Sequence, residues 1–234
     1  LADSFRERLQ AGGDTREPVA IVGVACRFPS ADGPAEFWRL LKEGRDAVSE
    51  VPPERWELGR WYDPDPQAAG KMYCRHGGFL SGLDRFDPVH FQITPREALS
   101  LDPQQRLLLE VGWHALENAG IPVPLPAEPP AGVFLGIGVS NYSGGACVNA
   151  PERLDVYSLA GNLASVAVGR LGHAFGLTGP NSPVDTACSS SLVAVHQACR
   201  SLRLGECRVA VAGGVNLTLA PEASVYFCRL GLLS

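Results

Sequence analysis

The 234-residue chain has no apolar run close to the roughly 18 residues that a membrane-spanning helix requires. It also has no excess of basic residues, since 20 Lys and Arg stand against 25 Asp and Glu and give a formal net charge of −5. A nucleic-acid-binding surface needs such an excess. The first ten residues are charged and lack the apolar core of a secretory signal. The sequence therefore argues against a membrane protein, a nucleic-acid-binding protein and a secreted protein.

Paired cysteines are missing as well. None of the seven cysteines forms a C-x-x-C pair, and no histidine lies beside them at metal-ligand spacing. They are Cys26, Cys74, Cys147, Cys188, Cys199, Cys207 and Cys228. This pattern predicts neither a disulfide scaffold nor a zinc site. We expect a cytoplasmic protein in which most of these cysteines are reduced and buried, with no metal and no cofactor bound by the chain itself.

Short apolar runs alternate with helical patterns along the chain. The apolar runs predict buried strands at residues 19–25, 133–139 and 208–212. Helical spacing, capping residues and terminal glycines predict helices at residues 34–44, 102–119 and 161–175. Residues 51–87 are rich in Pro, Gly, Asp and aromatics, which predicts a long segment with little regular structure. Alternating strands and helices are typical of an α/β architecture.

An extended segment, residues 183–187, stops abruptly at Cys188, and a helical pattern follows it as far as Gly205. A thiol at a helix N-terminus faces free backbone N–H groups and the positive end of the helix dipole, which both favour the nucleophilic thiolate. The same N–H groups can stabilise the oxyanion that forms when the sulfur attacks a thioester carbonyl. Cys188 is thus the candidate nucleophile for acyl transfer. From these residues alone, a buried structural cysteine is a simpler interpretation than a catalytic nucleophile. The position of Cys188 between a strand and a helix strengthens the catalytic interpretation, because α/β enzymes present nucleophiles at such junctions.

Three serines follow Cys188 and are alternative nucleophiles, but we interpret them as small first-turn residues that satisfy free N–H groups. The helix carries Leu192, Val195, Cys199 and Leu202 on one stripe, and small residues on its other faces. Small residues all round predict a helix that packs closely on more than one side, deep in the fold.

A cysteine nucleophile usually works with a nearby histidine. The chain has five histidines, at His76, His90, His114, His173 and His196. His196 lies eight residues along the same helix as Cys188, a rise of about 12 Å, and so cannot touch its sulfur. No histidine stands in a motif that marks it as a base. The sequence therefore offers a candidate nucleophile without an evident base.

Longer motifs carry a resemblance to a known family. They include EPVAIVGVACRFP, DRFDPVHFQITPREALSLDPQQRLLLE, GVFLGIG, GPNSPVDTACSSSLVAVHQACRSLRLGEC and VAVAGGVNL, and with shorter matches they cover nearly everything from Glu17 to Ser234. The chain resembles the N-terminal part of a β-ketoacyl synthase (ketosynthase) domain of a type I modular polyketide synthase. DPQQRLLLE and DTACSSSLVA together are highly specific to this family, and the departures from its pattern lie away from Cys188.

This resemblance implies an α/β, thiolase-like fold, in which two similar halves stack into a layered αβαβα core, with only the N-terminal half in this chain. It implies that Cys188 accepts an acyl chain as a thioester from the phosphopantetheine arm of an acyl carrier protein, with the Cys188 backbone N–H in the oxyanion hole. Decarboxylative Claisen condensation with a malonyl-type extender then elongates the polyketide. In the family, two histidines and a lysine of the second half drive that step, and their HGTGT-like and NIGH-like motifs do not occur here.

The chain stops at Ser234, near the midpoint of such a domain. We therefore expect residues 18–234 to be the N-terminal part of a ketosynthase domain and residues 1–17 to be a linker or lead-in helix. The resemblance implies four partners: an acyl carrier protein, a C-terminal ketosynthase segment, an adjacent acyltransferase domain, and a second copy paired through the segment before Cys188. Alone, this piece is expected to be inactive in condensation. The alternatives are a non-elongating acyl-transfer enzyme and a structural or docking half-domain.

Overall fold

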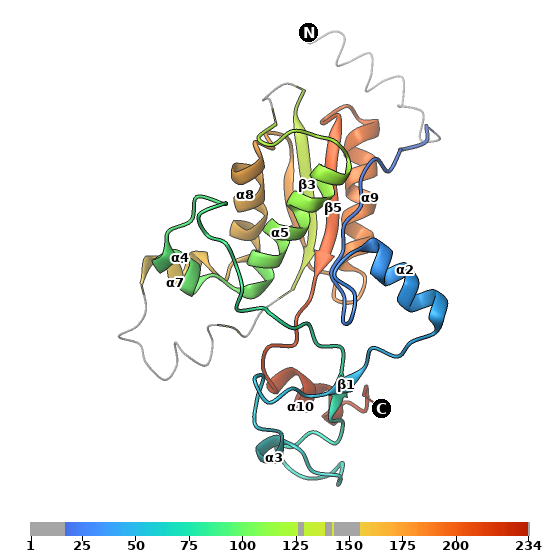
Figure 1. The fold of residues 1–234 in the computed structure, drawn as a ribbon, viewed down its shortest axis with the longest axis vertical. Helices are drawn as coiled ribbons and strands as arrows, with labels where there is room; N and C mark the ends of the chain where they lie inside the picture. Colours follow the sequence, from blue (N-terminus) through green and yellow to red (C-terminus); the bar gives the residue numbers. More distant parts are fainter. Residues whose placement is uncertain (1–16, 126–128, 139–141, 143–154, 234) are drawn as a thin grey trace. The chain divides into compact units, whose positions relative to one another are not determined.

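The computed structural model describes residues 17–125, 129–138, 142 and 155–233, which fall into two compact units. We call residues 17–25, 86–125, 129–138 and 155–216 the sheet unit, and residues 26–85, 142 and 217–233 the loop-rich unit. Figure 1 shows the elements of both units. The expected lead-in helix lies outside the described residues, apart from Glu17.

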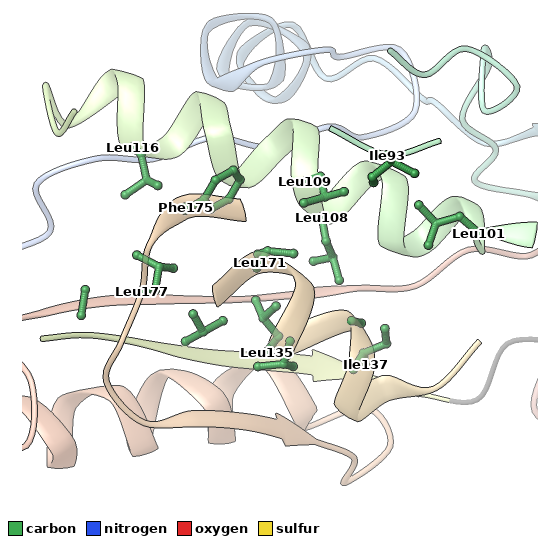
Figure 2. Packing of buried hydrophobic residues seen from close by; sticks show 14 residues of the cluster. Ile93, Leu101, Leu108, Leu109, Leu116, Leu135, Ile137, Leu171, Phe175 and Leu177 are labelled. Carbon is green, nitrogen blue, oxygen red and sulfur yellow. The ribbon is translucent and has the colours of Figure 1, made fainter. Parts of the chain in front are cut away.

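A three-stranded parallel sheet forms the centre of the sheet unit (Figure 1). In spatial order its strands are β4 (Asn181–Val184), β3 (Ala131–Ile137) and β5 (Val209–Val215). One face is covered by α5 (Pro103–Asn118) and α8 (Ala164–Phe175), and the other by α9 (Ser190–Arg203) (Figure 2). Because the strands are parallel, their carboxyl ends meet at one edge, where open α/β sheets bind ligands.

Apolar side chains fill the space between β3 and the two helices on its α5/α8 face (Figure 2). Leu109 of α5 and both Leu171 and Phe175 of α8 are fully buried. Gly112 of α5 allows close contact, because a Cβ there would lie 3.0 Å from the ring of Phe175. All seven residues of β3 are buried, which explains why its sequence is a continuous apolar run rather than an alternating one.

Helix α5 begins where the sequence predicts. The Asp102 carboxylate accepts the Gln104 N–H at 2.8 Å, and Pro103 occupies the first helical position. Both residue types favour these positions, since one supplies an acceptor for an unpaired N–H and the other has no N–H to satisfy. Asp102 is itself buried, so this cap is part of the core of the sheet unit.

Helix α8 begins three residues later than predicted. Two shorter helices, α4 (Pro95–Ser100) and α7 (Val156–Ala160), lie near its start. Gly161 follows α7, and its carbonyl accepts the Asp102 N–H at 2.9 Å, which fixes the chain against the start of α5. Leu163 is therefore extended, with φ −85° and ψ 130°, and serves as the N-cap of α8. The apolar pattern alone does not reveal this break.

The loop-rich unit has little regular structure between residues 51 and 85, as predicted. Its elements are α2 (Pro34–Glu43), β1 (Ser49–Glu50), α3 (Leu58–Trp61), β2 (His76–Gly77) and α10 (Glu222–Arg229), with β1 and β2 paired antiparallel. The helix predicted at residues 34–44 is confirmed, and Gly44 ends it in the left-handed conformation with φ 61°. A small core around Trp56, Met72 and Cys228 holds the unit together.

Two strand predictions need correction. Residues 19–25 form no strand in the described structure: the Val24 N–H donates to the side-chain oxygen of Asn118, and Ile21 is 89% exposed. A strand exists only where a neighbour completes its hydrogen-bond ladder, and this run has none among the described residues. The predicted strand at 208–212 forms as β5, but its residues are only half-buried because β5 is an edge strand.

Candidate active site

Cys188 lies between the carboxyl end of β4 and the start of α9, as predicted. The strand ends at Val184 and the helix begins at Ser190, so only five residues make the turn. The Cys188 side chain is exposed and forms no disulfide. An exposed thiol at this junction fits a nucleophile and argues against the simpler interpretation of a buried structural cysteine.

The turn contains a residue in an unfavourable conformation directly before Cys188. Ala187 has φ 54°, in the left-handed region that residues with a Cβ rarely adopt. Such a conformation costs about 1–2 kcal/mol for a non-glycine residue. Two side chains bind its peptide groups, because Asp185 Oδ1 accepts the Ala187 N–H at 3.2 Å and Ser190 Oγ donates to the Ala187 carbonyl at 2.7 Å. Each of these hydrogen bonds contributes about 0.5–1.5 kcal/mol, so the two together offset the cost of the left-handed conformation.

The serines after Cys188 do not cap α9, contrary to the prediction. Ser189 is the N-cap residue, but its side chain makes no capping hydrogen bond to the helix. Its hydroxyl donates to the Thr186 carbonyl at 2.8 Å instead. Ser190 Oγ accepts the Thr186 N–H at 2.9 Å while it donates to Ala187. The hydroxyls of Ser189 and Ser190 therefore hold the turn in front of the helix and do not cap the N–H groups of its first turn.

The start of α9 lies directly on two glycines of the sheet. Gly136 of β3 and Gly214 of β5 are register partners at the carboxyl end of the strands. A Cβ on Gly136 would lie 2.7 Å from the Ser191 nitrogen, and one on Gly214 would lie 2.9 Å from the Ser191 Cβ. Only glycine allows this approach. Sequence reasoning missed the pair, although both belong to glycine-containing strand ends, GIG and AGG, that stand out in the sequence.

Two features of this junction are relevant to an oxyanion. The turn hydrogen bonds use the N–H groups of Ser189 and Ser190, which donate to Thr186 and Ala187, and neither bond uses the N–H of Cys188. The positive end of the α9 dipole lies at the same place. A helix N-terminus at this place is able to stabilise negative charge that develops next to it.

Among the described residues, no histidine is placed to act as a base for Cys188. His196 is exposed on α9, and no hydrogen bond joins a described histidine to the thiol. His114 lies near Glu117 at 3.4 Å, and the His90 ring packs edge-on against Trp113 with centroids 4.4 Å apart. The remaining two, His76 in β2 and His173 in the last turn of α8, are also exposed. Nor do the described residues hold a group of three or more metal-ligating side chains.

Helix α9 buries small residues against the sheet, whereas Leu192 and Val195 of its apolar stripe are exposed, so the predicted close packing on more than one side is not seen in the described structure. Ala194 and Ala198 are buried together with Phe134 and Val184 of the sheet. Leu192, by contrast, is 75% exposed, and Val195 is exposed as well. The close approach to the sheet glycines demands small side chains on the inner face, and in the described structure the opposite face is uncovered.

Residues 16–234 match the family described as β-ketoacyl synthase, N-terminal domain. The chain belongs to this family. It is 50% identical over 235 residues to a phenolphthiocerol/phthiocerol polyketide synthase of Mycobacterium tuberculosis. It is 49% identical over 251 residues to the erythronolide synthase EryA3 of Saccharopolyspora erythraea. Both alignments cover 100% of this chain but only 15% and 8% of those relatives, so the chain spans a small part of their length.

Solved ketosynthase structures have the same fold. The oxazolomycin ketosynthase domain OzmH KS7 of Streptomyces albus superposes with a TM-score of 0.84 and 42% identity, over 90% of this chain and 37% of its own. The ketosynthase from module 6 of the bacillaene synthase of Bacillus subtilis 168 gives 0.79 and 37%, over 92% and 34%. The predicted fold class, the N-terminal part of an α/β thiolase-like fold, is thereby confirmed.

Two predictions from composition can also be compared with the structure. Among the described residues no helix is long and apolar enough to cross a membrane. The six described cysteines are all free, but only Cys207 and Cys228 are buried. The expectation that most cysteines are buried was therefore wrong, and Cys147 lies outside the described residues.

Proposed function

We propose that this chain is the N-terminal part of a polyketide ketosynthase and that Cys188 accepts the acyl chain. The Cys188 thiolate attacks the thioester carbonyl of an acyl chain on the phosphopantetheine arm of an acyl carrier protein, and the carrier thiol leaves. A malonyl-type extender then loses carbon dioxide. The resulting carbanion attacks the Cys188 thioester, a carbon–carbon bond forms, and the Cys188 thiol is released.

One observation carries this proposal: an exposed thiol beside the first turn of a helix whose start is fixed on a glycine pair. A nucleophile there needs no rearrangement to meet a thioester, and the Cys188 N–H is the donor that we assign to the developing oxyanion. Relatives named as polyketide synthases support the reaction class.

The condensation step needs groups from outside the described residues. Decarboxylation requires hydrogen-bond donors to the extender's developing enolate, and we assign these to histidines of a C-terminal ketosynthase segment. The exposed face of α9 and the exposed run at residues 19–25 are consistent with further protein covering them. The other proposed partners are the acyl carrier protein, an adjacent acyltransferase domain, and a second copy that contacts the segment before Cys188.

The acceptor step is tested with the chain itself and an acyl N-acetylcysteamine thioester, a small substitute for the carrier arm. Denaturing mass spectrometry should detect one acyl group on the peptide that contains Cys188. Cys188→Ala should abolish it and leave the fold intact, because one small side chain replaces another. Cys199→Ala, on the same helix, is the matched control and should load like the parent. Loading that persists in Cys188→Ala would show that Cys188 is not the acceptor.

A second experiment separates elongation from its alternatives. Native mass spectrometry of the purified sample reveals whether a second polypeptide accompanies the 24.9 kDa chain. Decarboxylation of a malonyl thioester by the assembled sample would support condensation. Acyl loading without decarboxylation in that assembly would support an acyl-transfer enzyme, and absence of loading would support a structural or docking role.

A further inference from the structure

Ala187 has φ 54°, in the left-handed region. Side chains bind the peptide groups on both sides of it. Asp185 Oδ1 accepts its N–H, and the hydroxyl and N–H of Ser190 both bind its carbonyl, at 2.7 and 3.1 Å. Ser190 Oγ also accepts the Thr186 N–H at 2.9 Å. The Ser190 hydroxyl therefore links the Thr186 N–H to the Ala187 carbonyl. These two groups lie on either side of the φ angle of Ala187, so the hydroxyl restrains that angle.

Among the three serines, Ser190 is the one whose hydroxyl is protected from water. Its exposed fraction is 9%, whereas Ser189 and Ser191 are exposed. Its backbone is fixed as well, because a Cβ on Gly136 would lie 2.8 Å from the Ser190 carbonyl carbon. Water cannot replace a hydrogen bond readily at a buried site, so loss of this hydroxyl leaves the Thr186 N–H without its partner and the Ala187 carbonyl with only the Ser190 N–H.

We infer that Ser190 is a positioning residue for the nucleophile: its hydroxyl holds Ala187 in the left-handed conformation, and this sets the direction of the Cys188 thiol relative to the start of α9. The catalytic consequence rests on the proposed function, because it concerns the residue that we propose as acyl acceptor. The structural consequence does not, since thiol reactivity can be measured without an acyl substrate.

The hydroxyl and the dihedral can be separated by two substitutions. Ser190→Ala removes the hydroxyl, after which Ala187 relaxes toward negative φ and Cys188 turns away from the helix N-terminus. Adding Ala187→Gly restores access to φ 54°, because glycine has no Cβ and adopts positive φ at no steric cost. We expect Ser190→Ala to lower the rate of Cys188 alkylation by iodoacetamide, and of acyl loading, about tenfold. The double variant should recover a large part of both rates.

The control is Ser201→Ala. Ser201 is a second buried serine of α9, 11 positions beyond Ser190, and its Oγ lies 3.5 Å from the Cys207 sulfur. Its loss tests the general effect of removing a buried hydroxyl from this helix. We expect the Cys188 alkylation rate to be unchanged, at any pH between about 6 and 9, whatever happens to the melting temperature.

Peptide-resolved mass spectrometry of the full chain gives the Cys188 rate in each variant, and melting temperatures are recorded in parallel. An unchanged rate in Ser190→Ala, or a loss that Ala187→Gly does not reverse, would overturn the inference. If Ser190→Ala does not fold, the double variant carries the test and must react at close to the parent rate. If the parent chain alkylates normally but never takes an acyl group, the proposed function fails and the positioning role of Ser190 is still decided.

Discussion

Gly136 and Gly214 lie opposite each other in neighbouring strands, and the first turn of α9 rests on both. Neither residue has an unusual φ, so the requirement for glycine comes from close approach alone. The pair brings the helix N-terminus within contact distance of the sheet at the carboxyl ends of the strands. The position of Cys188 thus depends on residues that are far from it in the sequence.

The first prediction concerns this pair. Gly136→Ala places a methyl group 2.7 Å from the Ser191 nitrogen, and backbone atoms on both sides cannot move aside cheaply. Overpacking of this kind costs about 1–3 kcal/mol. We expect lower stability in chemical unfolding and slower alkylation of Cys188. Gly213→Ala is the control, because a Cβ at Gly213 meets nothing within 4 Å. Equal effects of the two substitutions would contradict the close-packing argument.

A second prediction concerns the partly buried ion pair between Glu97 of α4 and Arg170 of α8. Arg170 Nη1 binds Glu97 Oε1 at 2.6 Å, and Arg170 Nε binds Gln105 Oε1 at 3.3 Å. Glu97→Leu leaves the Arg170 charge largely buried without its counter-ion. We expect a loss of about 2 kcal/mol, below the usual range for a fully buried pair because both side chains keep some contact with water.

The matched control for that pair is the exposed contact between His114 and Glu117 on α5. Glu117→Gln should change stability by less than about 0.5 kcal/mol, since exposed pairs contribute little. Urea unfolding of both variants gives the comparison. If Glu97→Leu proves as mild as Glu117→Gln, the pair between Glu97 and Arg170 does not stabilise the packing of α4 on α8.

A third prediction concerns acid stability. Desolvation raises the pKa of Asp155, but hydrogen bonds from the Ser158 hydroxyl, from the N–H groups of Tyr157 and Ser158, and from Arg96 outweigh it and lower the pKa. A lowered pKa in the folded state stabilises the protein above the unfolded pKa of about 3.9, and this contribution is lost as the pH falls through the folded pKa. The capping box that Asp155 and Ser158 form at the start of α7 is therefore weakened by acid.

Asp155→Asn tests this effect, because asparagine can cap a helix and does not titrate. The free energy of unfolding is measured between pH 7 and pH 3 for both proteins. We expect the parent to lose more stability than Asp155→Asn as the pH falls from the unfolded pKa of about 3.9 toward the lower pKa of the folded state. Parallel curves over this range would show that the Asp155 cap makes no pH-dependent contribution.

What the sequence predicted correctly rests on local chemistry. The start of α5 follows from Asp102 and Pro103, and the end of α2 from Gly44, because caps depend only on neighbouring residues. The place of Cys188 between a strand and a helix was predicted for the same reason, since a strand, a turn and a helix start are all visible in nine consecutive residues.

What the sequence did not reveal depends on partners from elsewhere in the fold. Residues 19–25 have the composition of a buried strand, but a strand needs a neighbour, and the run itself does not say whether one is present. Ser190 looked like a helix cap, yet its hydrogen bonds go back to Thr186 and Ala187. These bonds occur together with the left-handed conformation of Ala187, and an alanine gives no sign of that conformation in the sequence.

The last prediction uses the two faces of α9. Ala194 is fully buried against β3 and β4, whereas Leu192 is 75% exposed, although leucine is the more apolar residue. Burial rather than residue type should decide the cost of a substitution. In the 234-residue chain, Leu192→Ser should change stability by less than about 0.5 kcal/mol. Ala194→Leu should cost about 1–3 kcal/mol, because the added atoms have no space between the helix and the sheet.

Chemical unfolding of both variants decides between two orientations of this helix. If the apolar stripe faced the interior, Leu192→Ser would be severe, because a buried leucine contributes several kcal/mol, typically about 2–5, to stability. The orientation in which alanines and serines face the sheet predicts the opposite order. That order matters for the site, because the orientation that buries Ala194 also puts Ser190 against Gly136, where its hydroxyl reaches the turn before Cys188.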